Sequence, residues 1–153
     1  MWVCLCLVLL FKINTHVVNG SSMIPTFTEG DRILIDKGKT PKRYELVTLD
    51  PLKKPKESYI KRVIGIPNDT IKIDKNTLYL ETEDNKIVTV TLDASVANEL
   101  KGLEKIPKNN YFVMGDNRNH SNDSRSFGLV SIKQIEGVAF FRYYPLNRIG
   151  LIQ

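Results

Sequence analysis

The sequence predicts a mostly β protein: a β-sheet sandwich or barrel domain that follows a short N-terminal membrane anchor. Three observations lead to this fold class. Short β-branched segments alternate with turn residues, only one segment has helical spacing, and the chain opens with a wholly apolar run. At 153 residues the chain has room for one domain with a sizeable core. We therefore expect an anchor over residues 1–18 and one β-rich domain over residues 19–153.

The expected anchor rests on residues 1–11, which are all apolar and which Lys12 separates from Val17 and Val18. This run is shorter than the about 20 residues that a membrane-spanning helix needs. If the run is extended to Val18, with the Lys12 ammonium reaching the membrane–water interface, it is only marginally long enough to span the bilayer. A cleaved signal peptide and a buried core element are the alternatives. The favoured interpretation is a short or truncated anchor that attaches the domain to membrane lipid.

The expected strands are short and bounded by turn residues. They cover residues 32–37, 45–50, 58–66, 70–74, 77–82, 86–92, 111–114 and 137–144. Residues 83–85, Glu-Asp-Asn, are typical of a hairpin tip. The segment 94–103 places Val96, Leu100 and Leu103 at helical spacing and predicts a short surface helix.

Composition excludes several kinds of site. The 22 Lys and Arg residues against 17 Asp and Glu give a net charge of +5, which suits an anionic membrane surface. The basic residues are scattered and not interleaved with aromatic ones, so we expect no nucleic-acid partner. Both cysteines, Cys4 and Cys6, lie in the apolar leader, and His16 and His120 are the only histidines. We therefore expect no disulfide, no cysteine nucleophile, no metal and no cofactor, while the oligomeric state is left open.

The turn over residues 20–27, Gly-Ser-Ser-Met-Ile-Pro-Thr-Phe, is the first candidate for catalysis. Glycine permits close backbone approach, and Pro25 restricts Ile24 to extended conformations. A serine on such a rigid, irregular turn can be presented to a substrate. By itself the pattern is more often only a turn.

Lys61 is the second candidate, because side chains alternate across a strand and Lys61 shares a face with Tyr59 and Val63. Burial of that face would desolvate the ammonium and lower its pKa, which would allow the amine to act as a general base. An outward-facing lysine on a half-exposed strand is the simpler alternative, since lysine is seldom buried.

The polar loop over residues 115–128 directly follows an expected strand. It needs a hydrogen-bonding network to be ordered, or it is a solvated loop. Asp123 could pair with Arg125, and Asp116 with Arg62. The acidic spacing of a calcium-binding EF-hand is absent.

Taken together, four segments resemble the ordered sequence boxes of type I signal peptidases of the compact Gram-positive kind: residues 20–26, 30–34, 59–69 and 115–128. Members of that family are membrane-anchored serine proteases with a Ser/Lys dyad and a mostly β catalytic domain. The boxes cover a minor part of the chain, but their order and spacing span most of it. The resemblance implies that the domain lies on the extracytoplasmic side of the cell membrane and removes the signal peptides of exported preproteins.

The resemblance also assigns roles to single residues. Ser22 corresponds to the nucleophile, and Lys61 corresponds to the general base. Ser121 would orient the Lys61 amine by a hydrogen bond. Asp123 and Arg125 would form a pair that supports the catalytic residues without touching the substrate. A Ser22–His120–Asp123 triad is a weaker alternative.

The same resemblance implies an oxyanion hole at the backbone N–H of Ser22, whereas Gly20 stands where some relatives carry a further hydroxyl. Shallow pockets for small substrate side chains would be lined by Val18, Met23, Phe27, Tyr59 and Ile60. Asn68 replaces the glycine of a Pro-Gly-Asp turn, and asparagine tolerates the positive φ that such a turn needs. The substrate would bind in an extended conformation along a strand edge.

Two other functions compete with an active peptidase. One is a specialised or non-cleaving relative that serves a dedicated exported partner such as a surface-fibre subunit. The other is a self-cleaving repressor with the same Ser/Lys chemistry, but no helix-turn-helix pattern precedes Ser22.

Overall fold

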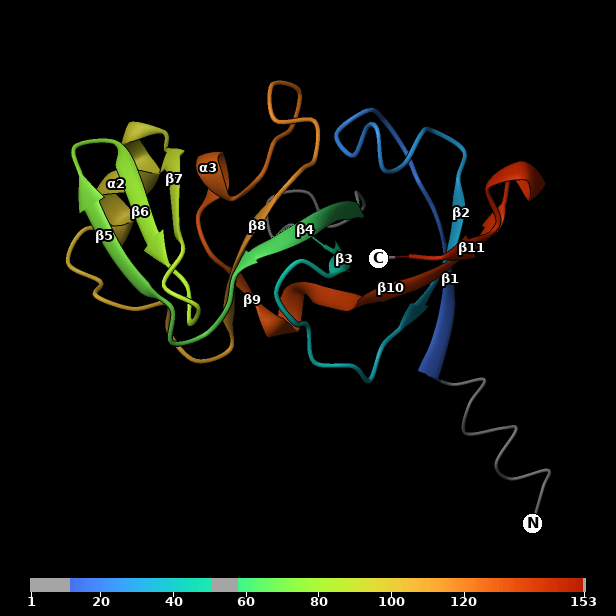
Figure 1. Cartoon of the computed structure of the whole chain (residues 1–153), viewed down its shortest axis with the longest axis horizontal. Helices are drawn as coiled ribbons and strands as arrows, with labels where there is room; N and C mark the ends of the chain where they lie inside the picture. Colours follow the sequence, from blue (N-terminus) through green and yellow to red (C-terminus); the bar gives the residue numbers. More distant parts are fainter. Residues whose placement is uncertain (1–11, 51–57, 153) are drawn as a thin grey trace, which may run out of the picture.

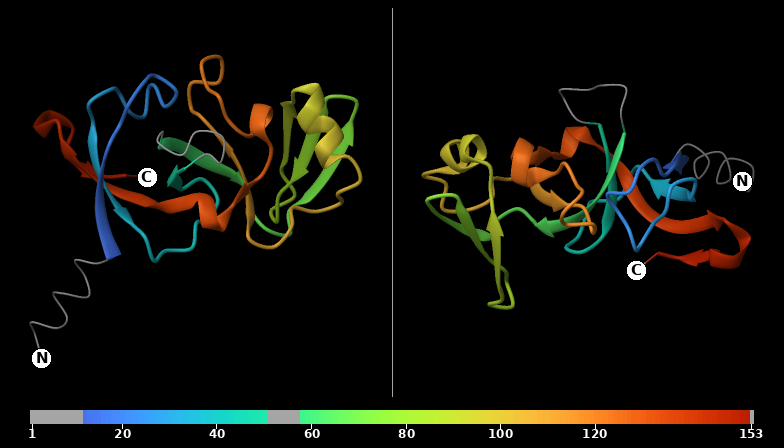
Figure 2. Two further views of the ribbon diagram at one scale, coloured as in Figure 1. Left: turned by 180° about the vertical axis from the view of Figure 1, so that it is seen from behind. Right: turned by 90° about the horizontal axis from the view of Figure 1, so that it is seen from above.

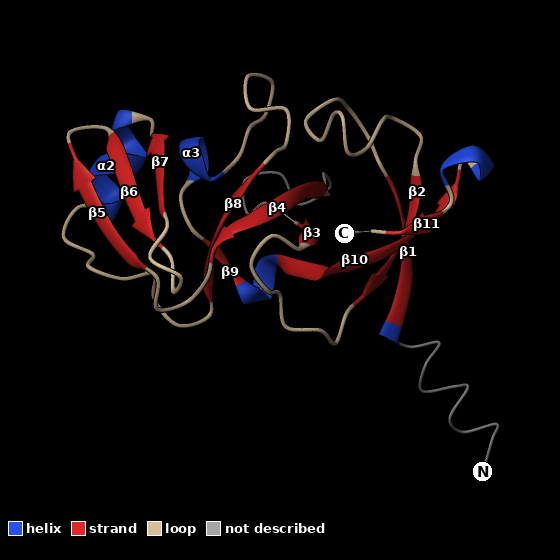
Figure 3. Cartoon of the chain, viewed as in Figure 1, coloured by secondary structure: helices blue, strands red, loops and turns tan. Residues whose placement is uncertain are grey.

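The computed structural model describes residues 12–50 and 58–152, and it confirms the mostly β fold class (Figures 1 and 3). The main sheet has the strand order β1-β2-β10-β3-β4-β8-β9, with β11 paired to β10. Its strands are β1 (Ile13–Val17), β2 (Arg32–Asp36), β3 (Leu46–Leu49), β4 (Tyr59–Gly65), β8 (Asn110–Met114), β9 (Val130–Ser131), β10 (Ile135–Tyr144) and β11 (Gly150–Leu151).

A smaller sheet forms the other end of the molecule (Figure 1). It has the order β5-β6-β7, and all its pairs are antiparallel. The remaining elements are β5 (Thr70–Asp74), β6 (Thr77–Glu81), β7 (Ile87–Thr91), the helices α2 (Ala94–Leu100) and α3 (Ser124–Phe127), and the 3-10 turns η1 (Ile132–Gln134) and η2 (Leu146–Arg148).

β10 organises the main sheet because it pairs antiparallel with β2, β3 and β11. Its pairing with β2 and β3 contains irregularities, which bend a strand and increase its twist. The main sheet accordingly curls on itself (Figure 2). A Cβ atom at Gly137 would lie 2.9 Å from the carbonyl oxygen of Asp36, so glycine allows the backbone of β2 to approach here.

The middle of the main sheet is buried on both faces. Leu46 and Val47 are neighbours in β3, yet they belong to different hydrophobic clusters because successive side chains point to opposite faces. The first cluster lies beside the β1–β2 connection and comprises Val18, Met23, Phe27, Ile33, Ile35, Leu46, Ile60 and Ala139. The second comprises Val47, Leu49, Val63, Tyr111, Val113, Val130 and Val138.

A third cluster joins the small sheet and α2 to the main sheet through Phe112 and Met114 of β8. Its members from the small sheet include Leu78 and Leu80, the inward-facing residues of β6. Gly65, at the end of β4, lies directly against this cluster. A Cβ atom there would come within 2.6 Å of the Leu80 side chain, so a larger residue would force the two sheets apart.

Each strand expected from the sequence is present, with bounds that agree to within two residues at either end. Asn85 of the expected hairpin tip has a φ of 57° and lies between β6 and β7. The expected helix is α2, but it ends at Leu100, so Leu103 lies outside it and is partly exposed. The sequence did not predict the short elements α3, β9 and β11, because so few residues carry no periodic pattern.

The expected anchor falls partly on described residues. Residues 13–17 form β1, which pairs with β2, so this part of the expected span belongs to the sheet. Residues 1–11 lie outside the described residues, and the anchor there stays a prediction. Within residues 12–50 and 58–152, no helix has the length and apolar character needed to cross a membrane.

Candidate active site

The turn that carries Ser22 is held at both ends by backbone hydrogen bonds. Val18 N–H donates to the carbonyl of Asp31 at 2.8 Å, and Gly30 N–H donates to the carbonyl of Val18 at 2.9 Å. Between these points Met23 and Phe27 are buried in the first cluster. These apolar anchors fix the backbone on either side of Ser22.

Two arginines close the same turn from the C-terminal end of the chain. Arg142 donates to the carbonyl of Thr26 at 3.0 Å and to the Asp31 carboxylate at 3.2 Å. Arg148 donates to the carbonyl of Thr26 at 3.1 Å and forms a second ion pair with Asp31. The sequence did not indicate this clamp, because it joins residues more than a hundred positions apart.

Ser22 and Lys61 are in direct contact. Lys61 Nζ lies 2.9 Å from Ser22 Oγ, and it also donates to the carbonyl of Ile60 at 3.0 Å. The Lys61 residue is only 3% exposed, which rules out the outward-facing alternative. The ring of Tyr59, on the same strand face, has its centroid 5.0 Å from the ammonium nitrogen.

Burial lowers the pKa of Lys61 from 10.5 to about 8, because the charged form loses its hydration. The negative charge of Asp123 opposes this shift but does not cancel it. A substantial fraction of Lys61 is therefore a neutral amine at mildly alkaline pH, and a neutral amine can accept a proton from a hydroxyl.

Asp123 organises the loop that covers Lys61. Its carboxylate is fully buried, accepts the backbone N–H of Gly115 at 3.0 Å, and is paired with Arg125 at 2.8 Å. Burial raises the pKa of Asp123, but the hydrogen bonds from Arg125 and Gly115 outweigh it and hold the pKa below its usual value. The expected Asp123–Arg125 pair is confirmed, and Asp123 also caps the short helix α3.

The loop is fastened directly to the serine turn. Asn117 donates its backbone N–H to the carbonyl of Ser22 at 3.0 Å and its side-chain amide to the carbonyl of Ser21 at 3.1 Å. Gly115 fills the narrow space between them, since a Cβ atom there would lie 2.5 Å from the Ser22 carbonyl oxygen and would overlap the side chain of Ser121.

The expected hydrogen bond from Ser121 to Lys61 is not among those in the described residues. Ser121 Oγ is buried next to Gly115, with no hydrogen-bond partner, while Lys61 donates to Ser22 and Ile60. Ser121 therefore lies at the site, but in this structure its hydroxyl does not hold the lysine.

A second ion pair in the loop is the one expected between Arg62 and Asp116. Arg62 donates to both oxygens of Asp116, at 2.8 and 2.7 Å, and to the carbonyl of Tyr44 at 2.7 Å. The Thr26 hydroxyl also donates to Asp116. Asp116 thus joins β4, the loop and the serine turn.

The turn after β4 has the conformation expected for Asn68, whose φ is 73°. The next residue, Asp69, accepts the backbone N–H of Ile66 at 2.8 Å and is held by both guanidinium NH groups of Arg43. This buried ion pair fixes the point where the chain leaves the main sheet for the small one.

The residues expected to line substrate pockets separate into two groups. Val18, Met23, Phe27 and Ile60 are buried in the first cluster, beside Ser22. Tyr59 differs, because it is half-buried and packs against the second cluster. Gly20 has a φ of 77°, with open space where a side chain would project.

His120 does not build the alternative triad. It is exposed, and its backbone N–H donates to the carbonyl of Asn117 at 3.0 Å. The Asp123 carboxylate that such a triad needs is instead occupied by Arg125 and Gly115. In the part of the chain that the structure describes, no three His, Cys, Asp or Glu residues are placed to hold a metal ion.

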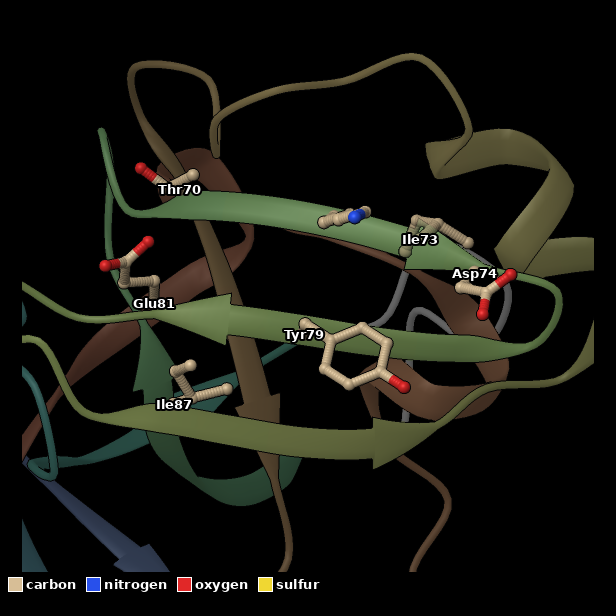
Figure 4. Close-up of a pocket in the computed structure, with 7 residues that line it drawn as sticks. Thr70, Ile73, Asp74, Tyr79, Glu81 and Ile87 are labelled. Atoms are coloured by element: carbon tan, nitrogen blue, oxygen red, sulfur yellow. The ribbon is translucent and has the colours of Figure 1, made fainter.

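A hollow lies away from this site, on the outer face of the small sheet (Figure 4). It has a volume of about 670 Å³ and is lined by Thr70, Lys72, Ile73, Asp74, Tyr79, Glu81 and Ile87. None of these residues contacts Ser22 or Lys61, so the hollow is separate from the candidate active site.

Comparison with known proteins agrees with the resemblance seen in the sequence. The family model described as signal peptidase, peptidase S26, matches residues 1–144. Signal peptidase I P of Bacillus subtilis subsp. natto is 35% identical over 161 residues, which cover 94% of this chain and 86% of that protein. Signal peptidase I of Bacillus caldolyticus is 34% identical over 156 residues, which cover 92% and 85%. A crystal structure of a signal peptidase I from Enterococcus faecalis matches with 29% identity and a TM-score of 0.46, over 65% of this chain and 97% of that one. The chain therefore belongs to the signal peptidase family, peptidase S26, a family of serine endopeptidases.

Proposed function

We propose that this protein is a membrane-anchored serine endopeptidase that removes signal peptides from exported preproteins, with Ser22 as nucleophile and Lys61 as general base. The observation that carries the proposal is the 2.9 Å contact between Lys61 Nζ and Ser22 Oγ. Family membership supports the substrate class, since the relatives described above are signal peptidases I.

The reaction follows from the properties of the two side chains. Neutral Lys61 accepts the hydroxyl proton of Ser22 as Oγ attacks the scissile carbonyl, and the new C–O bond gives a tetrahedral intermediate. The C–N bond then breaks, and the Lys61 ammonium returns the proton to the leaving amine. Water hydrolyses the acyl-enzyme by the same sequence of proton transfers.

Stabilisation of the negatively charged oxygen is assigned to the backbone N–H of Ser22. Among the described residues this N–H has no hydrogen-bond acceptor, so it is available to a substrate. Loss of one oxyanion donor typically costs about 10²- to 10³-fold in rate. Gly20, two residues earlier, offers no side-chain donor but leaves open space for the substrate chain.

The apolar cluster beside Ser22 supports binding of the signal-peptide side of the substrate. Val18 lies just before the serine turn and Ile60 lies in β4 next to Lys61. Both are apolar and packed in the first cluster. A surface of this kind admits small side chains and excludes large ones, since the surrounding core cannot expand cheaply. We assign the residues before the cut to this side, with Met23, Phe27 and Tyr59 completing the walls.

Exposed apolar residues support attachment to a membrane. They belong to β1, to the end of β10 and to the chain from η2 to β11, which lie at the end of the molecule away from the small sheet (Figure 1). The group comprises Ile13, Val17, Tyr144, Leu146, Ile149 and Leu151, of which Leu146 and Leu151 are 75% and 78% exposed. Exposed apolar side chains mark interaction sites when they gather, and Ile13 lies close in sequence to the proposed anchor at residues 1–11.

The test is cleavage of a fluorogenic peptide that spans a signal-peptide cleavage site. We expect Ser22→Ala and Lys61→Ala to lower the rate about a hundredfold or more. Matched controls are Ser21→Ala, at the exposed neighbouring serine, and Lys72→Ala on the small sheet, and both should keep the wild-type rate. Unchanged rates in the Ser22 and Lys61 variants would exclude the dyad, and tight capture of one exported protein without turnover would favour the accessory role.

A further inference from the structure

A second cavity, of about 470 Å³, lies between the small sheet and the loop that carries the catalytic-site residues. Figure 1 shows β7 as the strand of the small sheet nearest to α3 and to that loop. The cavity is lined by Val88, Thr89, Val90 and Thr91 of β7, and from the opposite side by Tyr44, Ile64, Met114, Arg118 and Arg125. Its walls thus come from both sheets.

One wall of the cavity is the unpaired edge of a β-sheet. β7 is the last strand in the order β5-β6-β7, so only one of its edges is bonded to β6. At the two ends of the β6–β7 ladder, Leu92 N–H donates to the carbonyl of Asn76 and Thr82 N–H donates to the carbonyl of Lys86. Hydrogen-bonded pairs alternate along an antiparallel ladder, so the pairs between these ends are Val90–Leu78 and Val88–Leu80.

The intervening residues Thr89 and Thr91 therefore direct their backbone N–H and C=O groups toward the free edge. In the described part of the chain these groups have no hydrogen-bond partner. An edge of this kind is a template for an added strand, and an extended peptide can pair with it.

The opposite wall carries an unneutralised positive charge. Arg118 forms no ion pair with any described residue, and its guanidinium donates to the sulfur of Met114 at 2.9 Å. Its charge helps lower the pKa of Asp116, but both oxygens of Asp116 are already held by Arg62 and Thr26. A carboxylate that enters the cavity can therefore pair with Arg118 without displacing another acid.

The cavity and the candidate active site share the loop over residues 115–128. Asn117, which donates its N–H to the carbonyl of Ser22, is the residue directly before Arg118. Val18 and Ile60 belong to the apolar cluster that we assign to the residues before the cut, and this cluster lies beside the serine turn. The loop that holds Arg118 contacts the same turn separately, through Asn117. A substrate chain that crosses Ser22 from this cluster can continue along the loop toward β7.

We infer that this cavity binds the first residues of the preprotein that follow the cut, as an extended strand paired with the free edge of β7, with an acidic side chain on Arg118. The inference rests on the proposed function and adds a binding site for the part of the substrate that is released as the mature protein. The ligand class is an extended, acidic peptide segment. Backbone pairing with β7 supplies affinity for any sequence, and Arg118 supplies the preference for a carboxylate.

The experiment uses the full chain and synthetic peptides that share one sequence before the cut. A short peptide ends just after the cut, and longer ones carry a segment in which a single Asp, moved one position at a time, is compared with Asn. We expect the best-placed Asp peptide to have a KM about tenfold lower than its Asn counterpart, as for one charge-assisted hydrogen bond. The preference should weaken as salt is added.

Two variants on different elements test the two walls. Arg118→Gln should bring the ratio of the Asn KM to the Asp KM close to one. Lys72→Gln, the same charge change on the outer face of the small sheet, should leave that ratio at about ten, as for one charge-assisted hydrogen bond. Thr89→Pro removes an outward N–H without touching the ladder to β6. It should reduce the advantage of the long peptides over the short one.

Because each readout is a ratio within one enzyme, a partly unfolded variant does not distort it. Equal KM values for Asp and Asn peptides at every position in the wild type, with cleavage intact, would overturn the inference and leave the proposed function standing. Cleavage that survives Ser22→Ala would instead overturn the proposed function. Self-association that Thr89→Pro abolishes, without any effect of peptide length, would assign the edge to a second copy of the chain and also overturn the inference.

Discussion

Lys61 Nζ and Ser22 Oγ lie 2.9 Å apart, although 39 residues separate them in the chain. The lysine comes from the middle of β4, and the serine from a turn fixed by buried Met23 and Phe27. Because Lys61 is enclosed by packed residues, its pKa is lowered to about 8, and the contact joins the proposed nucleophile to the proposed base.

The pH dependence of the reaction should report Lys61. Its pKa of about 8 implies that the rate falls as the pH drops below this value, because the protonated amine cannot accept the Ser22 proton. Measurement of kcat/KM from pH 6 to 10 on a fluorogenic signal-peptide substrate should give a rising limb centred near pH 8. A flat profile would contradict a lysine base.

Replacement of Lys61 by methionine should stabilise the fold while abolishing activity. Below pH 8 the native state must bury a charged ammonium, whereas the unfolded chain keeps its lysine hydrated. Between pH 8 and 10.5 the unfolded state binds more protons than the native state, so wild-type stability rises with pH there. We expect Lys61→Met to raise the free energy of unfolding at pH 6 by on the order of 2–3 kcal/mol and to remove that rise. Urea unfolding of both proteins at pH 6 and at pH 10.5 measures the two free energies of unfolding. A variant less stable than wild type at pH 6 would contradict the burial argument.

Loss of the Asp69 carboxylate should destabilise the junction between the sheets. Its side chain is fully buried and paired with Arg43 at 2.6 Å, so Asp69→Ala leaves a largely buried guanidinium without its partner. The expected loss in the free energy of unfolding is about 3–5 kcal/mol. The control is Lys39→Gln, which breaks the exposed pair with Glu45 and should cost less than about 1 kcal/mol.

A methyl group at Gly115 should impair catalysis more than stability. It would overlap Ser121 and press on the carbonyl of Ser22, which moves the nucleophile relative to Lys61. A shift of this size can cost about a hundredfold in kcat. Gly150→Ala, where nothing lies within 4 Å of the added atom, is the matched control and should cleave like wild type. Wild-type kcat in Gly115→Ala would show that the loop does not position Ser22.

The candidate site could be predicted only in part. The Asp123–Arg125 pair and the turn at Asn68 followed from residue types at local spacing. Ser22 and Lys61 were singled out as a pair only by resemblance to a known family, and the Asp116–Arg62 pair was suggested by opposite charges alone. The hydrogen-bond partner of Ser121 could not be predicted in this way. Its place beside the site is as expected, but a hydroxyl can rotate toward several partners, and here it does not reach Lys61.

The sequence by itself determined the strand-rich fold, because alternating β-branched segments and turn residues act over a few neighbouring positions. Tertiary structure decided what depends on distant residues meeting. The clamp of Arg142 and Arg148 on the serine turn, the burial of Lys61, and the cavity between β7 and Arg118 each join segments far apart in the chain. Residues 13–17 make the same point: their apolar neighbours suggested an anchor, but pairing with β2 placed them in the sheet. The local sequence pattern determines which strands can form. Packing in the tertiary structure determines which strands pair and which side chains are desolvated.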